Sequence, residues 1–158
     1  MDKGKVFAQV VAELEGQLQV LQQAVKAAHL AATHEESKAE DKYDTRGLEA
    51  SYLAGAQQAR VEELSALLQT YRGLPIKKFG KKDPIEATAL VSLDSDGVKS
   101  QVLLGPGRPL SLKVDGKPLQ VITPSSPLGE ALLGKAAGDT VEIRVRGEWK
   151  EYEVLSVS

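Results

Sequence analysis

Apolar residues recur at alternating intervals of four and three near the start of the chain, and this spacing constrains the fold more than any other feature. The series is Phe7, Val11, Leu14, Leu18, Leu21, Val25, Ala28 and Ala32. Such an alternation places apolar side chains along one side of an α-helix, as in a coiled coil. Gly16 is the single glycine or proline within the series. The sequence therefore predicts a long helix that buries one apolar seam against a partner.

A second seam of the same kind precedes Gly73. Its members are Ala50, Ala54, Gln57, Val61, Leu64, Leu68 and Tyr71. Small residues replace leucine toward its beginning, which lets two helices approach closely or leaves that end less tightly packed. Each helix is about 30 residues long, or about 45 Å at about 1.5 Å per residue. We expect the two helices to pair within one chain as an antiparallel hairpin, and an intermolecular coiled coil is the alternative.

The segment between the seams, residues 33–52, is polar and rich in carboxylates. Its acidic residues are Glu35, Glu36, Glu40, Asp41, Asp44 and Glu49. A turn between two helices needs only about 2–8 residues, so this segment is longer and more acidic than a connection requires. The carboxylates predict a hairpin tip that reaches a cation. Basic residues at positions 38, 42 and 46 alternate with the acids, so a solvated, salt-bridged tip is the alternative.

Beyond the second seam the chain changes character. Gly73-Leu74-Pro75 ends the helix, because glycine suits the left-handed cap position and proline cannot continue a helix. Residues 75–84 form a basic linker, which either contacts phosphates or is simply solvated. Six strands are expected at 87–93, 98–104, 110–114, 119–123, 140–145 and 149–157, with one helix at 127–133. The predicted domains are a hairpin at 1–74, a linker at 75–84 and a small α+β domain at 85–158.

Composition excludes several functional classes. The formal net charge is −2 and aromatic residues make up 4%, which argues against broad electrostatic binding to nucleic acid. The chain has no cysteine, which excludes disulfides and thiolate sites. No run approaches the roughly 18 apolar residues of a membrane span, so a cytoplasmic protein without membrane contact is expected. His29 and His34 are five residues apart, a spacing that does not place two metal ligands on one helix face.

Residues 122–143 resemble the C-terminal signature of the bacterial GreA/GreB transcription factors. The matching parts are Ser126-Pro127, Ala131-Leu132-Leu133-Gly134-Lys135, Gly138-Asp139 with the valine-rich strand after it, and Glu151-Tyr152-Glu153-Val154-Leu155. The resemblance implies an α+β fold, in which an antiparallel coiled-coil hairpin with an acidic tip precedes a small FKBP-like antiparallel-sheet domain with one helix. That fold raises a prolyl isomerase as an alternative. Such isomerases use an aromatic-lined pocket, and this domain has only Trp149 and Tyr152.

The resemblance also implies a partner, RNA polymerase, which the C-terminal domain of family members binds at the rim of the secondary channel. The matching positions for that contact are Ser125, Ser126 and Pro127. Helix capping is a second role for the same residues, and both roles are compatible. We expect only an indirect interaction with the nascent RNA 3′ end, and we expect DNA-binding as part of a role in transcription. We expect a monomer that is not itself an enzyme.

The family's cleavage-stimulating members carry a tip similar to Gly-Asp-Leu-Ser-Glu-Asn-Ala-Glu-Tyr, whose acidic pair helps hold the second magnesium at the polymerase active site. The candidate catalytic residues here are Glu36, Glu40, Asp41 and Asp44, with Glu40 and Asp41 as the magnesium ligands within the complex. The chain is expected to carry no cofactor of its own, since the polymerase supplies the magnesium. Carboxylate oxygens are ligands that magnesium prefers.

The tip departs from the family pattern, because no Asp-Leu-Ser-Glu string is present. In one register Glu40 takes the family's glutamate and Asp41 its asparagine. In a second register Glu40 takes the aspartate and Asp44 the asparagine. Two functions therefore stay open: a factor that promotes cleavage of backtracked RNA, and a non-cleaving regulator of the same channel, similar to DksA or to other Gre paralogues. A coiled-coil adaptor without a polymerase role is a third.

Overall fold

The structure is a computed structural model, and it describes the backbone of residues 1–33 and 46–158. Within these ranges, the side chains of residues 32, 33, 46–51 and 54 are not described. By its contacts the chain forms two compact units: Met1–Val10 with Gly73–Ser158, and Val11–Arg72. The division into 1–74, 75–84 and 85–158 stays a prediction. No described helix combines the length and hydropathy that crossing a membrane requires.

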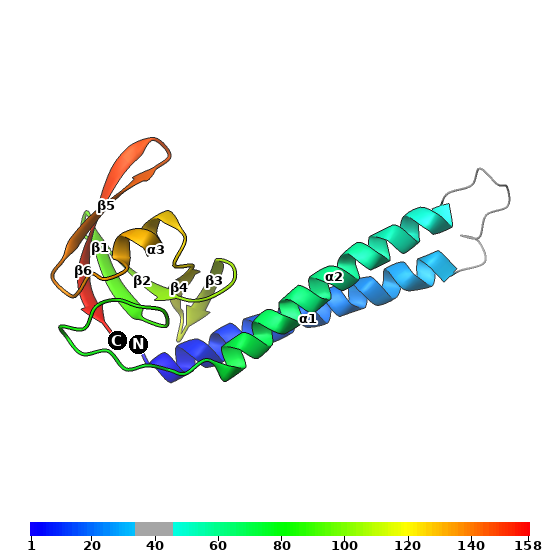
Figure 1. Cartoon of the computed structure of the whole chain (residues 1–158), viewed down its shortest axis with the longest axis horizontal. Helices are drawn as coiled ribbons and strands as arrows, with labels where there is room; N and C mark the ends of the chain where they lie inside the picture. Colours follow the sequence, from blue (N-terminus) through cyan, green and yellow to red (C-terminus); the bar gives the residue numbers. More distant parts are fainter. Residues whose placement is uncertain (34–45) are drawn as a thin grey trace. The chain divides into compact units, whose positions relative to one another are not determined.

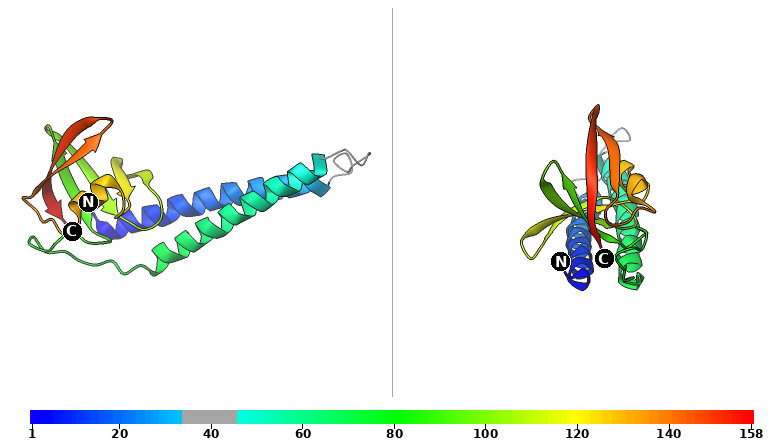
Figure 2. Two further views of the ribbon diagram at one scale, coloured as in Figure 1. Left: turned by 45° about the horizontal axis from the view of Figure 1, so that its top comes forward. Right: turned by 90° about the vertical axis from the view of Figure 1, so that its left-hand side faces the viewer.

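The hairpin consists of α1 (Lys3–Thr33) and α2 (Arg46–Gly73), which run side by side in opposite directions (Figures 1 and 2). Its buried seam contains Leu14, Val61, Leu64, Leu68 and Tyr71. Burial raises the pKa of Tyr71 to about 12. An ion pair between Arg72 and Glu15 connects the end of α2 to α1. The predicted intramolecular pairing is therefore confirmed for the described part of both helices.

The beginning of α1 buries more than the predicted seam. Val6 and Val10 are fully buried beside Phe7, whereas the predicted seam residue Val11 is only half-buried. Residues 1–10 belong to the unit that also contains Gly73–Ser158. The first turns of α1 therefore have different packing partners from the remainder of the helix. A heptad pattern describes contact with one partner helix only. It therefore did not predict the burial of Val6 and Val10.

The unit formed by residues 1–10 and 73–158, called the C-terminal unit below, contains one six-stranded sheet with the order β3-β4-β2-β1-β6-β5. Its strands are β1 (Leu90–Ser95), β2 (Val98–Leu104), β3 (Leu110–Val114), β4 (Lys117–Ile122), β5 (Thr140–Val145) and β6 (Glu148–Val157). The helix α3 (Pro127–Leu132) follows β4 (Figure 1). The predicted α+β class, with a helical hairpin before a sheet domain with one helix, is confirmed.

One detail of the predicted sheet is corrected, because β2 and β4 pair in parallel and the sheet is mixed. The physical reason is the path of the chain. After Leu104 the chain moves to the edge of the sheet as β3, turns at Asp115-Gly116, and returns as β4 between β3 and β2. Turn signals predict hairpin neighbours only, so they cannot predict a strand that inserts beside an earlier one.

One face of the sheet carries the core on which α3 packs. Its buried residues are Ile85, Ala89, Val91, Leu93, Val102, Leu104, Ile122, Leu132, Val141, Val154 and Val157. Leu132 from α3 is fully buried, and such burial contributes about 2 kcal/mol to stability. Phe79, Leu128, Ala131 and Tyr152 complete this core at its border. The packing fixes the position of the turn that precedes α3.

Lys3 connects three segments of this unit. Its Nζ donates to the carbonyl oxygens of Lys77, at 2.5 Å, and Ser158, at 2.9 Å. The same ammonium lies 4.5 Å from the centre of the Phe79 ring. Burial, together with the nearby Lys77 ammonium, lowers the pKa of Lys3 to about 8. Both termini accordingly lie close together in Figures 1 and 2.

Thr88 is held in an unfavourable conformation. It is 6% exposed, its backbone has φ 73°, and its Oγ1 has no hydrogen-bond partner within the described part of the chain. The Thr88 N–H donates to the Leu104 carbonyl oxygen at 2.8 Å, which keeps the backbone in place. A positive φ costs a residue with a Cβ about 1–2 kcal/mol, and an unpaired buried hydroxyl costs about 1–3 kcal/mol.

We expect Thr88→Gly to stabilise the protein. Glycine removes both costs, and its own entropic penalty is only about 0.5–1 kcal/mol, so the free energy of unfolding should rise by about 1 kcal/mol. Urea unfolding measures the change. Thr88→Ala is the control, because it removes the hydroxyl but keeps the strained Cβ and should give a smaller gain. A lower unfolding free energy for Thr88→Gly than for the parent chain would show that the side chain supports the fold.

Candidate functional site

The predicted acidic tip lies outside the described residues. Glu36, Glu40, Asp41 and Asp44 all fall within residues 34–45, between the end of α1 at Thr33 and the beginning of α2 at Arg46. Their roles, including the assignment of Glu40 and Asp41 to magnesium, stay predictions. Among residues 1–33 and 46–158, no group of three or more His, Cys, Asp or Glu side chains is arranged to hold a metal ion.

The second predicted site, the turn before α3, is fully described. Ser126 is the N-cap of α3, and its Oγ accepts a hydrogen bond from the Gly129 N–H at 3.1 Å. The same hydroxyl donates to the Thr123 carbonyl oxygen at 2.7 Å, which also accepts from the Ser126 N–H at 3.0 Å. Pro127 occupies the beginning of the helix, where a missing N–H costs nothing. These bonds lock residues 123–129 into one shape.

Glycine is required at position 129 by close packing. A Cβ on Gly129 would lie 2.0 Å from the Thr123 carbonyl oxygen and 2.9 Å from the Ser126 Oγ. Both neighbours belong to the turn itself, so neither can withdraw without breaking it. Sequence reasoning missed this residue. A glycine inside a short helix is a weak signal on its own, since glycine there usually costs stability.

The three predicted contact residues divide into two roles. Ser125 and Pro127 are exposed. Ser126 is half-buried, and its hydroxyl forms both hydrogen bonds of the cap. Ser125 Oγ lies 3.3 Å from Thr123 Oγ1, within the same exposed turn. The capping role predicted for Ser126 is therefore present. The structure presents Ser125 and Pro127 outward, and their role in binding stays a prediction.

This division predicts different effects of two neighbouring serines on stability. Ser126→Ala should lower the free energy of unfolding by about 1 kcal/mol, because the Gly129 N–H and the Thr123 carbonyl oxygen lose a partner. Ser125→Ala should change it by less than about 0.5 kcal/mol, as expected for an exposed position. Thermal unfolding of both variants measures the difference. Equal losses would contradict the assignment of the cap to Ser126 alone.

The two aromatic residues of this domain do not share a pocket. In the β5–β6 pair Trp149 faces Arg144 and Tyr152 faces Val141. Residues three apart on a strand point to opposite faces of the sheet. Tyr152 accordingly borders the core, whereas Trp149 is 71% exposed on the other side. This geometry gives no support to the aromatic-lined pocket of an isomerase.

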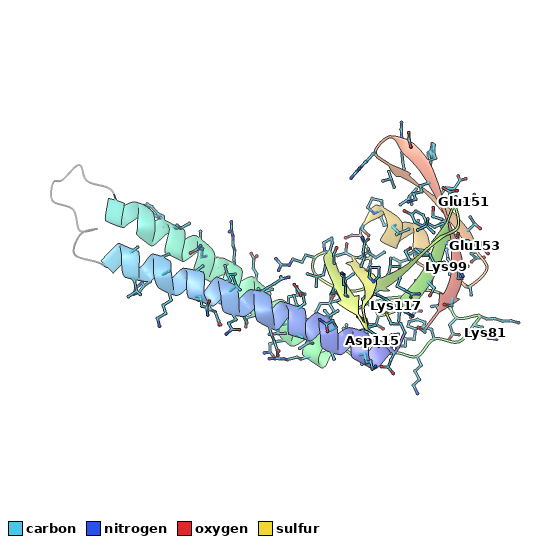
Figure 3. All side chains as sticks on the ribbon, turned by 180° about the vertical axis from the view of Figure 1, so that it is seen from behind. Lys81, Lys99, Asp115, Lys117, Glu151 and Glu153 are labelled. Carbon is cyan, nitrogen blue, oxygen red and sulfur yellow. The ribbon has the colours of Figure 1, made fainter. Side chains whose placement is uncertain are left out.

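The basic linker is partly engaged with its own unit. Lys77 forms an ion pair with Glu86 and lies over the Phe79 ring. The Asp83 carboxylate accepts from the Gly80 N–H at 2.7 Å, which forms a tight turn. Lys78, Lys81 and Lys82 are exposed around this turn, and Figure 3 labels Lys81. The interaction of these lysines with phosphates stays open.

Comparison with known proteins identifies relatives along most of the chain. The family model "Transcription elongation factor, GreA/GreB, C-term" matches residues 114–158. "Transcription elongation factor GreA" of Xanthomonas campestris pv. campestris is 31% identical over 131 residues, which are 81% of this chain and 77% of that protein. The GreA of Methylobacterium sp. (strain 4-46) is 28% identical over 160 residues, covering 99% of this chain and 98% of the relative.

A relative with a different name is also similar. "Transcription inhibitor protein Gfh1" of Thermus aquaticus is 26% identical over 152 residues, covering 96% of this chain and 91% of that protein. The crystal structure of Thermus aquaticus Gfh1 aligns with 92% of this chain and 92% of its own, with 26% identity and a TM-score of 0.41.

Proposed function

The chain belongs to the GreA/GreB family of transcription elongation factors, and on that premise we propose that it binds RNA polymerase through the secondary channel and promotes cleavage of backtracked nascent RNA. In this proposal the protein acts as a monomer in the cytoplasm. It is not an enzyme by itself, because it contributes part of a site that the polymerase completes.

The hairpin supplies the reach that this function needs. Helix α1 has 31 residues and α2 has 28, so the pair extends about 45 Å at about 1.5 Å per residue. The segment that joins the two helices contains Glu36, Glu40, Asp41 and Asp44. The C-terminal unit would supply a second contact, because Ser125 and Pro127 are exposed on its turn at 123–129.

The chemistry rests on the tip carboxylates. Two metal ions about 3.5–4 Å apart activate the attacking water and stabilise the leaving oxygen when a phosphodiester is hydrolysed. Glu40 and Asp41 would provide oxygen ligands toward the magnesium of the polymerase active site. The donor set fits, because magnesium prefers hard oxygen ligands and often takes only one or two carboxylates from a protein. The chain needs no cofactor of its own in this mechanism.

The single observation that carries the proposal is the combination of GreA similarity over most of the chain with a carboxylate-rich segment between the two paired helices. The experiment is a fragment-release assay on a stalled elongation complex with RNA labelled at the 3′ end. We expect short 3′ fragments in proportion to the bound protein. An unchanged fragment yield at saturating protein would contradict the proposal.

A second candidate, a non-cleaving regulator that occupies the same channel, is favoured by two specific observations. The tip lacks the Asp-Leu-Ser-Glu string, and a relative similar over 96% of this chain is named a transcription inhibitor. The assay distinguishes the two functions when a cleaving Gre factor is added as competitor. Binding without fragment release, together with inhibition of the competitor's cleavage, would establish the regulator.

A further inference from the structure

The linker after α2 has no regular secondary structure of its own. Residues 74–89 are all described and contain neither a helix nor a strand (Figure 1). Ile85 is anchored firmly, because it is fully buried and its N–H donates to the Lys135 carbonyl oxygen at 2.7 Å. Residues 74–84 therefore connect α2 to this anchor. The contacts that these residues make decide how much of the connection is restrained.

Two contacts of the linker restrain it only weakly. Lys77 forms its ion pair with Glu86 at the surface, where both side chains are about half exposed, and such pairs contribute little to stability. The hydrogen bond from the Gly80 N–H to the Asp83 carboxylate joins two residues of the linker itself. It shapes a turn but does not attach the linker to the sheet.

Lys3 makes the contacts that do attach the linker. Its ammonium donates to the carbonyl oxygen of Lys77 at 2.5 Å and to that of Ser158 at 2.9 Å. The same group lies 4.5 Å from the centre of the Phe79 ring, and Phe79 packs at the border of the core. Hydrogen bonds from an ionised donor are stronger than those between neutral groups, and a cation over an aromatic face adds attraction. One side chain of α1 thus joins the linker to the residue that follows β6.

The surroundings of Lys3 favour these contacts over water. Its side chain is half-buried, so a hydrogen bond from its ammonium is electrostatically stronger than one in open solvent. Lys5 on the same helix differs in this respect, because it forms a 3.2 Å ion pair with Asp115 in which both side chains are 63% exposed. Lys3 therefore contacts the linker, whereas Lys5 contacts the turn between β3 and β4.

We propose that Lys3 and Phe79 form a clasp, which fixes residues 77–79 to the C-terminal unit and limits the free connection after α2 to residues 74–76. An extended chain spans at most about 3.3–3.6 Å per residue, so the free connection reaches about 10 Å when the clasp is closed. When the clasp opens, residues 74–84 are released and reach about 36–40 Å. The clasp is a conformational device that sets the length of this connection. It does not depend on the proposed function.

Chymotrypsin digestion of the full chain tests the clasp. This protease takes an aromatic side chain into its specificity pocket, so it cleaves after Phe79 only when the ring leaves its packed position. Lys3→Met removes the charge and the donors but keeps an apolar side chain. It should raise the rate of cleavage after Phe79 about tenfold, because the linker then opens locally. The digestion is run below the lowered pKa of Lys3, where the parent chain keeps its ammonium charged.

Lys5→Met is the matched control, since it makes the same chemical change on the same helix. It breaks only the exposed pair with Asp115 and should leave the rate of cleavage after Phe79 within about twofold of the parent rate. Cleavage after Tyr152, which lies on β6 within the sheet, reports unfolding of the whole unit and should stay unchanged in both variants.

Two results would overturn the clasp. Equal rates of cleavage after Phe79 in Lys3→Met and in the parent chain would show that Lys3 does not restrain the linker. A parallel rise in cleavage after Phe79 and after Tyr152 would assign Lys3 to the stability of the whole unit. A rise after Phe79 alone, absent in Lys5→Met, is the predicted result.

Discussion

Replacing Gly129 with alanine is expected to lower the free energy of unfolding by about 3 kcal/mol, the upper part of the range for overpacked sites. The added Cβ would lie 2.0 Å from the Thr123 carbonyl oxygen, which is far inside any van der Waals contact. That oxygen accepts from both the Ser126 N–H and the Ser126 hydroxyl. Relief of the clash must therefore break the cap of α3 or shift the helix away from the sheet.

Thermal unfolding with circular dichroism measures this loss, which corresponds to a fall in Tm of roughly 10 °C. Gly16→Ala is the control, because nothing lies within 4 Å of the Cβ that it would add. In a helix interior that change should stabilise slightly, by about 0.5–1 kcal/mol. Polymerase binding by Gly129→Ala should fall as well, since the turn that presents Ser125 would lose its shape. An unchanged Tm would mean that the turn at 123–129 is adaptable.

The second large effect is expected at the tip. Glu40→Ala combined with Asp41→Ala should reduce fragment release at least about 100-fold, the scale on which removed transition-state contacts act. Polymerase affinity and thermal stability should stay unchanged, because the role proposed for both carboxylates is in the reaction alone. Single-turnover release from a backtracked complex at equal occupancy measures the effect.

A matched control exists on α2, where the adjacent acidic residues Glu62 and Glu63 are both exposed. Alanine at both positions makes the same change in charge and should leave release near the parent rate. The Asp44→Ala variant distinguishes the two alignment registers of the tip. A loss as large as that of Asp41→Ala would favour the register that uses Asp44. Full activity of the Glu40/Asp41 double variant would exclude both carboxylates from the reaction.

The predictions that succeeded depend on local sequence patterns, either a repeating period or a helix-cap signal. The spacing that contains Leu14 on α1 and Leu64 on α2 predicted a paired hairpin, and both residues are buried in it. The signals around Ser126 and Pro127 predicted the beginning of α3. Alternating segments with turn residues between them predicted all six strands to within a few residues.

The parts that sequence could not supply depend on contacts between distant segments. Burial of Val6 and Val10 and the parallel pairing of β2 with β4 both arise from how the C-terminal unit assembles. The strain at Thr88 is set by its bond to Leu104, and the need for glycine at 129 by its approach to Thr123. None of these contacts between distant segments produces a periodic pattern in the local sequence.

Transcript release from a backtracked elongation complex tests most directly whether the acidic segment works inside RNA polymerase. The complex is incubated with saturating parent chain, with polymerase alone as the baseline, and the rate at which 3′-labelled fragments appear is measured. A release rate well above that baseline, lost in the Glu40/Asp41 double variant, is the predicted result. A rate equal to the baseline while the protein is demonstrably bound would contradict the cleavage function.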